Sequence, residues 1–228
     1  GDLAAQSGSV RLGERRLETL LDEFGADVVA AAVEIILDAA EKQARDVIAA
    51  WKDGTYHGVA LLDDDGRGNQ DIAIRAKVTK QGNGLEVDLS GSDDEVTSFV
   101  NSSYANMQSA VAMALAFLFD PETPKNDGSL RPVKVIAREG SIVWAKPGAP
   151  VTLSTSHCAQ EIIEAIIRAL APACPERAMA GWGRRFRIAI KGEDPRNGKQ
   201  FIWHMFHARP GAGASSGGDG WHGSGEWH

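Results

Sequence analysis

One short segment of the sequence combines the residue types of a turn with side chains that bind anions. It runs from Pro124 to Pro132 and places the amide of Asn126 and the guanidinium of Arg131 on either side of Gly128. A guanidinium can hold a carboxylate or phosphate through two parallel hydrogen bonds, so Asn126 and Arg131 are candidate substrate-binding residues. The structural alternative is a turn in which Asn126 bonds its own backbone and Arg131 forms an ion pair. The sequence leaves both interpretations open.

A second group of polar residues comes at the predicted start of a helix. His157 and Cys158 follow Ser154-Thr155-Ser156, a predicted N-cap. The positive end of the helix dipole favours anions and lowers a thiol pKa, so His157 is a candidate for lining a site. The only other cysteine is Cys174, and the spacing of the two fits neither a disulfide framework nor a zinc pattern. We therefore expect two buried thiols.

The C-terminal segment is rich in glycine, histidine and tryptophan. Seven glycines lie between Gly211 and Gly225, and the potential metal ligands near them are Asp219, His222, Glu226 and His228. A glycine-rich loop rarely holds an unsupported set of ligands rigidly. His204 and His207 lie in a strand pattern that directs them to opposite faces. Because no Gly-Lys-Ser/Thr follows the glycines, the segment is no phosphate loop. We predict no metal ligands and no ATP site in this chain.

Hydrophobic periodicity predicts the elements that must position these residues. Helices are expected at 11–24, 26–53 and 104–118 and after residue 157, and strands at 56–62, 72–78, 85–89, 132–136, 142–145, 186–190 and 201–205. The first two helices are expected to form an antiparallel pair, with the apolar stripe from Val29 to Trp51 in the core. Asp63–Asn69 is predicted to be a solvated turn between strands, because it lacks the downstream glutamate of an EF-hand.

These elements predict an α+β fold in which amphipathic helices pack on antiparallel β meanders. We expect residues 1–228 to form a single α+β portion. Within it, 1–53 is the helical pair, and 54–228 is a mixed part that ends in the glycine-rich loop. The net charge of −7 argues against a nucleic-acid partner. No apolar run is long enough to cross a membrane and the first residues do not form a signal peptide, so we expect a cytoplasmic protein.

Several motifs together resemble the hydantoinase B/5-oxoprolinase family, the large subunit of ATP-dependent hydantoinases. The motifs are Gly1-Asp2-Leu3-Ala4-Ala5-Gln6, Asn101-x-x-Tyr104-Ala105, Pro124-x-Asn126-x-Gly128-x-x-Arg131-Pro132, Glu139-Gly140-Ser141 and Ala208-Arg209-Pro210-Gly211 followed by Asp219-Gly220. The last motif makes Arg209 and Asp219 further substrate-binding candidates. The chain departs from the family pattern by inserting Ala212–Gly218 and by the Trp and His residues that follow.

The resemblance implies a part of an enzyme complex that opens cyclic amides such as hydantoins or 5-oxoproline. ATP is expected on the partner A-type subunit, where it activates the substrate carbonyl by phosphorylation. A divalent metal is expected in the complex, with its ligands outside this chain in the remainder of the B-type subunit. Catalytic residues are not assigned. Two alternatives remain: a subunit of an acetone- or acetophenone-type carboxylase, and a scaffold or interface module that is inactive alone.

Overall fold

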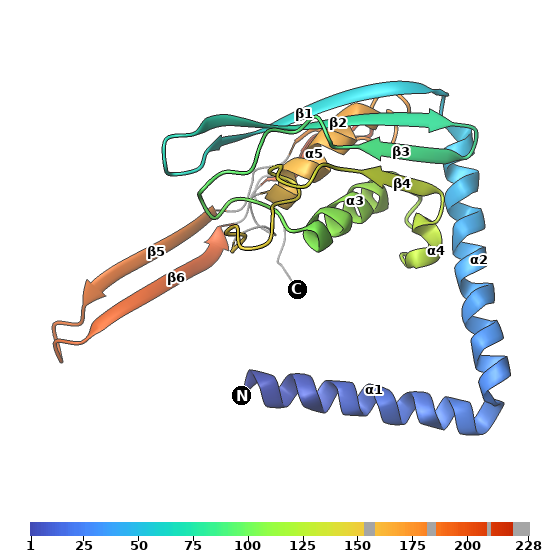
Figure 1. The fold of residues 1–228 in the computed structure, drawn as a ribbon, viewed down its shortest axis with the longest axis horizontal. Coiled ribbons are helices and arrows are strands. Elements are labelled where there is room, and N and C mark those ends of the chain that lie inside the picture. Colours follow the sequence, from blue (N-terminus) through green and yellow to red (C-terminus); the bar gives the residue numbers. More distant parts are fainter. Residues whose placement is uncertain (153–157, 182–185, 209–210, 221–228) are drawn as a thin grey trace.

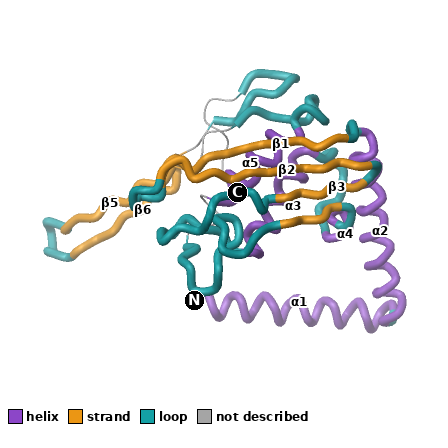
Figure 2. Tube along the Cα trace, turned by 45° about the horizontal axis from the view of Figure 1, so that its top comes forward, coloured by secondary structure: helices purple, strands orange, loops and turns teal. Residues whose placement is uncertain are grey.

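The computed structural model of the chain describes all residues except 153–157, 182–185, 209–210 and 221–228. It confirms the α+β class: a four-stranded sheet carries helices on one face, and a long helical arm and a two-stranded hairpin project from this body (Figures 1 and 2). The helices are α1 (Asp2–Phe24), α2 (Ala26–Ala50), α3 (Tyr104–Leu118), α4 (Asp127–Leu130) and α5 (Cys158–Leu170). The strands are β1 (Gly54–Asp64), β2 (Gln70–Gln81), β3 (Gly84–Asp88), β4 (Val133–Ile136), β5 (Phe186–Glu193) and β6 (Gln200–Ala208).

The four-stranded sheet has the order β1-β2-β3-β4. The first three strands form the predicted antiparallel meander, with Ala60 paired to Ile74 and Val78 to Val87. The fourth strand corrects the all-antiparallel prediction, because β4 runs parallel to β3. A parallel neighbour needs a long crossover, and here α3 and α4 lie between the two strands in the chain.

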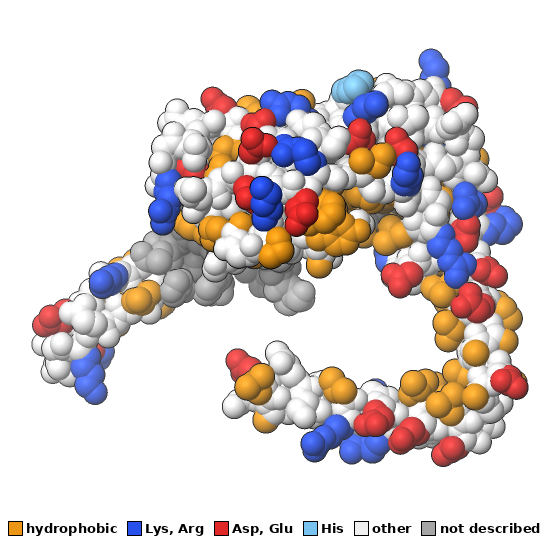
Figure 3. Space-filling view, viewed as in Figure 1, with side chains coloured by type: hydrophobic (Ala, Val, Ile, Leu, Met, Phe, Trp, Pro, Cys, Tyr) orange, Lys and Arg blue, Asp and Glu red, His pale blue; other side chains and the backbone are white. Residues whose placement is uncertain are grey.

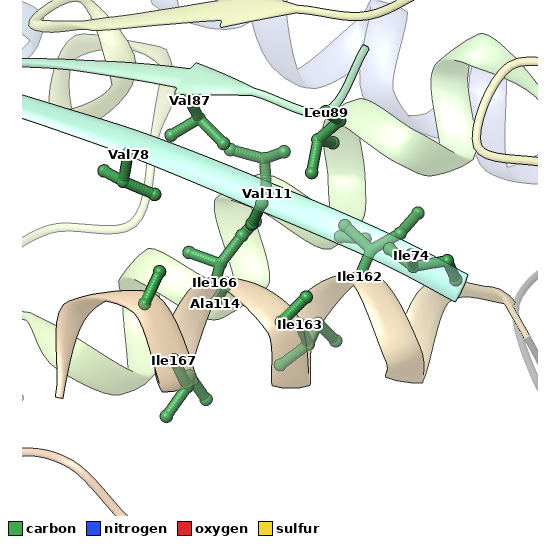
Figure 4. Packing of buried hydrophobic residues seen from close by; sticks show 14 of the residues in the cluster. Ile74, Val78, Val87, Leu89, Val111, Ala114, Ile162, Ile163, Ile166 and Ile167 are labelled. Carbon is green, nitrogen blue, oxygen red and sulfur yellow. The ribbon is translucent and has the colours of Figure 1, made fainter. Parts of the chain in front are cut away.

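The core lies between the sheet and the two helices that cover it. On α5 the apolar residues that the periodicity placed inward are buried, and this helix packs against α3, β1 and β2. Figure 4 shows part of this layer. Among the fully buried side chains are Ile74, Leu89, Met107, Ile162 and Ile166. Each fully buried aliphatic side chain contributes about 1.5–3 kcal/mol to folding relative to an exposed one. The buried side chains between the sheet and helices α3 and α5 therefore stabilise the packing of these elements on one another.

The first two helices do not form the predicted antiparallel pair. They meet at Gly25, whose φ of 82° needs a residue without a Cβ, and α1 turns away from α2 instead of lying alongside it (Figure 1). α1 has no buried residue, and α2 buries only Ala40, Ala44 and Ile48. The prediction that the whole stripe from Val29 to Trp51 is core is therefore correct only for its C-terminal half.

The other local predictions have mixed outcomes. Asp63–Asn69 contains the expected turn, and Ser103 caps α3 by accepting a hydrogen bond from the amide of Asn106. Residues 142–145 are not the predicted strand but a buried turn. The backbone of this turn forms hydrogen bonds with Asp93 and Ser102 and pairs with none of the six strands named above. No helix in the described ranges has both the length and the apolar character that a membrane span requires.

Candidate functional site

The segment that first suggested anion binding forms a tight turn against the long helix α2. Asn126 caps the short helix α4, and its Oδ1 accepts a hydrogen bond from the amide of Gly128 at 3.0 Å. Gly128 lies directly on the backbone of α2, since a Cβ at this position would stand 2.1 Å from the carbonyl oxygen of Leu37. The glycine is therefore required by a helix-to-turn contact and not by an unusual backbone angle.

Arg131 completes this contact. Its guanidinium lies 2.6 Å from a carboxylate oxygen of Asp38, 3.2 Å from Glu34 and 3.3 Å from Glu41. Hydrogen bonds to Asp38, Glu34 and Glu41, in that order of importance, raise the pKa of Arg131. The pKa of Glu41 is lowered by its hydrogen bond to Arg45 and by Arg131. We call Asn126, Gly128 and Arg131 together with the three acids of α2 the α2 clamp.

The contacts of the α2 clamp correspond to the structural interpretation of the motif. Asn126 bonds its own turn, and the guanidinium of Arg131 is turned toward three carboxylates of α2 and not toward an open anion site. The sequence held a signal that we missed: Glu34, Asp38 and Glu41 repeat at helical spacing, which places them on one face of α2. Whether Asn126 and Arg131 also bind substrate stays a prediction.

Replacing Arg131 by glutamine is expected to loosen α2 from the body. The three acids would lose their shared cation and repel one another, so we expect the melting temperature to fall by roughly 2–4 °C at low salt. The difference should shrink at high salt, because the pairs are partly exposed. The control is Lys134→Gln, which removes one exposed ion pair with Glu86. Equal melting temperatures for the two variants would contradict a clamp.

Beside the clamp lies an apolar groove of about 390 Å³. Its walls are α3 and the segment from Pro124 to Leu130, and the side chains along α3 are Ser109, Ala112, Met113, Leu115, Ala116 and Phe119. Met113 is half exposed on this helix, and Phe117 nearby is 44% exposed. The groove is thus an apolar surface on the outer side of α3, with the polar turn of Asn126 at its edge.

The two cysteines are buried, as predicted. The thiol of Cys158 donates a hydrogen bond to the carbonyl of Ile142 at 3.3 Å, and that of Cys174 donates to Leu170 at 3.4 Å. Burial raises the pKa of Cys158 well above its ordinary value, with Glu161 adding to the effect. Burial also raises the pKa of Cys174 to about 12. Because the thiolate is the nucleophile, neither residue is suited to nucleophilic catalysis near neutral pH.

Both thiols are therefore expected to resist modification in the folded protein. A disulfide reagent such as DTNB should release no appreciable chromophore at pH 8 until denaturant unfolds the chain, and should then titrate two thiols. The reason is that a protonated thiol without solvent access reacts slowly. Rapid reaction of one thiol in the native protein would show an accessible, activated cysteine and would contradict this prediction.

Asn101 of the Asn-x-x-Tyr-Ala motif is fully buried and joins three parts of the chain. Its Nδ2 lies within hydrogen-bond distance of the carbonyls of Val96, Ser98 and Pro150, at 2.8, 2.9 and 3.0 Å. Its Oδ1 accepts from the amide of Val96 at 2.8 Å. The amide group thus satisfies backbone groups that would otherwise be buried without partners. Asn101 thus positions the start of α3 and does not present its amide to solvent, whereas Tyr104 of the same motif is 49% exposed.

The remaining candidates are not brought together by the described structure. His157 and Arg209 lie outside the described residues, as do His222, Glu226 and His228. Asp219 is exposed in the segment 211–220. This segment is held by a hydrogen bond that the amide of Ala180 donates to the carbonyl of Ala214. Strand β6 contains His204 and His207, as predicted, and pairs His204 with Ala189 in the backbone register. The substrate-binding roles of His157, Arg209 and Asp219 stay predictions.

The described residues supply no ligand set for the divalent metal that the resemblance implies for the complex, and no ATP-binding residue is assigned among them. Within the described ranges no group of three or more His, Cys, Asp or Glu side chains could hold a metal ion. No reaction step through either group is derived from this chain.

Comparison with known proteins shows the family to which this chain belongs. Residues 1–228 match the family model described as hydantoinase B/oxoprolinase. The chain belongs to this family. Its relatives include the caprolactamase beta subunit of Pseudomonas jessenii, 36% identical over 224 residues that make up 97% of this chain and 38% of that protein. The B-type subunit of a putative D-/L-hydantoinase from Pseudomonas sp. (strain NS671) is 29% identical over 86% of this chain and 35% of its own length.

Two solved structures share the fold. The crystal structure of the ATP-dependent caprolactamase from Pseudomonas jessenii superposes with a TM-score of 0.86 at 35% identity, covering 97% of this chain and 38% of that one. A nucleotide-free acetone carboxylase superposes with a TM-score of 0.74 at 18% identity, covering 90% of this chain and 29% of that one. The second likeness shows the fold alone. The chain spans less than two-fifths of the length of these relatives.

Proposed function

We propose that this chain is part of the B-type subunit of an ATP-dependent cyclic-amide hydrolase that opens a lactam-like ring. The observation that carries the proposal is the 36% identity to a caprolactamase beta subunit over 97% of the chain. A carboxylase is supported only by a likeness of fold at 18% identity. The proposed substrate class is the one that the names of the relatives indicate, a caprolactam or a hydantoin, with 5-oxoproline as a third member.

Within such a subunit the described part acts chiefly as a scaffold. Its thiols are protonated and buried, Arg131 is held in the α2 clamp, and Asn101 is enclosed by backbone. We propose that ATP is bound by a partner A-type subunit, and that a divalent metal is held by the remainder of the B-type polypeptide. Asn126, Arg131, His157, Arg209 and Asp219 are the residues of this chain proposed to approach the substrate.

The test is a substrate comparison on the complex assembled from the whole B-type polypeptide and its ATP-binding partner. Phosphate release and ring-opened product would be measured with caprolactam, hydantoin, 5-oxoproline, acetone and acetophenone, the ketones with and without bicarbonate. We expect ATP consumption coupled to opening of a cyclic amide. Turnover of a ketone that strictly requires bicarbonate, with no amide opened, would show a carboxylase. Turnover by the 228 residues alone would contradict the scaffold role.

A further inference from the structure

Ten of the twenty exposed large apolar side chains in the described ranges lie on the helical arm. We call α1 together with the N-terminal half of α2, residues 26–38, the arm. Its exposed large apolar residues are Leu3, Val10, Leu12, Leu17, Leu20, Phe24, Val28, Val33, Ile35 and Ile36. A contiguous apolar surface of this extent marks an interaction site in a folded protein.

The pattern on α1 is that of a helix made to be buried on one side. Leu3, Val10, Leu17 and Phe24 recur at intervals of seven, while the charged residues Arg11, Arg15, Glu18 and Asp22 occupy the opposite side. None of its residues is buried by the described chain. Because an isolated helix gains little stability from propensity alone, α1 needs a surface to pack on.

The exposed apolar face at the start of α2 is continuous with the face that the same helix buries in the core. Ile48, Ala44 and Ala40 are fully buried against the body, and the same helix face continues through Ile36 and Val33, which are 57% and 49% exposed. Val28 and Ile35 leave a second side of the helix apolar. Two sides of this half of α2 are thus apolar, and its acidic side, with Glu34 and Asp38, belongs to the α2 clamp. A helix with so wide an apolar face ordinarily packs against other elements. The α2 clamp lies where burial ends, so the projecting half is held at a fixed angle.

The groove beside α3 faces the same space. α1 turns back beneath the body (Figure 1), and the space-filling view shows a hollow between this arm and the underside of the body (Figure 3). Hydrophobic side chains gather on both sides of this hollow in Figure 3, along the arm and on the underside of the body. Met113 and Phe117 supply exposed apolar side chains on α3. The arm and the groove together form one concave docking surface.

We propose that this docking surface holds a further folded part of the same B-type polypeptide, the part that corresponds to what the longer relatives carry outside the matched region. The match covers 38% of the caprolactamase beta subunit, so about three-fifths of that chain lies outside it. A segment on the same polypeptide acts at a local concentration of about millimolar, which favours it over a separate partner. The continuity of the α2 face with the core favours an occupant that completes the core. This inference does not depend on which ring or ketone the enzyme uses.

The first experiment measures whether the surface is covered in the whole B-type polypeptide. Because both cysteines of residues 1–228 are buried, a cysteine introduced at the surface can be followed by maleimide labelling. Leu17→Cys, Ile36→Cys and Met113→Cys report on the docking surface, and Arg15→Cys on the charged side of α1 is the matched control. We expect the three probes to react at least about tenfold more slowly than the control. Equal rates would overturn the proposal.

The second experiment identifies the occupant. A diazirine side chain placed at Ile36 in the same polypeptide would be photolysed, and the products separated by mass and mapped as peptides. We expect a cross-link within one polypeptide to a peptide outside residues 1–228, with no gain in mass. A product of twice the mass would show a second copy, and one joined to another subunit would show a different partner. Either of these, or cross-links confined to residues 1–228, would overturn the proposal.

Discussion

Replacing Gly58 by alanine is expected to destabilise the body strongly. Gly58 lies in β1 under helix α5. A Cβ at this position would stand 2.0 Å from the carbonyl oxygen of Ala165 and 2.6 Å from the amide nitrogen of Ala169. Both atoms belong to a helix backbone and cannot rotate away as a side-chain tip can. Helix and sheet would have to separate, which we expect to cost about 3 kcal/mol of unfolding free energy.

The measurement is urea unfolding of the wild type and the variant, followed by circular dichroism. The matched control is Gly91→Ala, since a Cβ at Gly91 meets no atom within 4 Å and its backbone angle is ordinary. That control should change the unfolding free energy by no more than about 0.5 kcal/mol. A Gly58 variant as stable as the control would show that α5 does not rest on β1 as the structure describes.

The sequence predicted the elements of the body because their apolar residues follow one simple period each. Alternation in β2 placed Ile72, Ile74, Ala76 and Val78 on one face, and all four are buried. The helical stripe of α5 was equally clear. Periodicity shows which side of an element is buried, and the body consists of elements buried by their neighbours within this chain.

Periodicity could not predict what covers each stripe. The stripe of α2 looks uniform from Val29 to Trp51, but its buried residues, Ala40, Ala44, Ile48 and Trp51, all lie in its last half. The chain also buries Lys80, at 3% exposure, whose ammonium donates to the carbonyl of Trp51 at 2.6 Å and to Asp53 at 2.7 Å. A lysine in an alternating strand is normally assigned to the wet side. The acceptor that satisfies it lies far away in sequence, so no local pattern could reveal it.

The candidate site shows the same limit in another form. The motif around Asn126 suggested chemistry, because amides and guanidiniums at turns recognise ligands, and the motif around Asn101 carried the family resemblance. In the structure both asparagines bond backbone atoms, and Gly128 with Arg131 joins the turn to α2. A close approach of two backbones requires glycine, as at Gly128, and a buried set of backbone groups requires a side-chain amide, as at Asn101. A motif of this kind therefore identifies the family without assigning its chemistry.

Replacing Asn101 by alanine is expected to cost about 3–4 kcal/mol of unfolding free energy. The substitution leaves the amide of Val96 and carbonyls of Val96, Ser98 and Pro150 without their partner in a fully buried site. Each orphaned group costs roughly 1–3 kcal/mol when no water replaces the partner. Chemical denaturation at pH 7 measures the loss. As a control, Asn83→Ala removes an exposed side chain with one weak contact to Arg45 and should cost no more than about 0.5 kcal/mol.

The substitution Asn101→Asp separates the hydrogen-bond account from a simple loss of volume. The new carboxyl keeps an acceptor for the amide of Val96 but, when ionised, turns an oxygen toward three carbonyls in place of a donor. Burial and that repulsion raise its folded pKa above the unfolded value of about 3.9, so the variant regains stability as the pH falls through the raised pKa. Its unfolding free energy relative to the alanine variant should therefore be lower at pH 7 and recover toward pH 4. A deficit that does not change with pH would show that the amide fills space and does not donate.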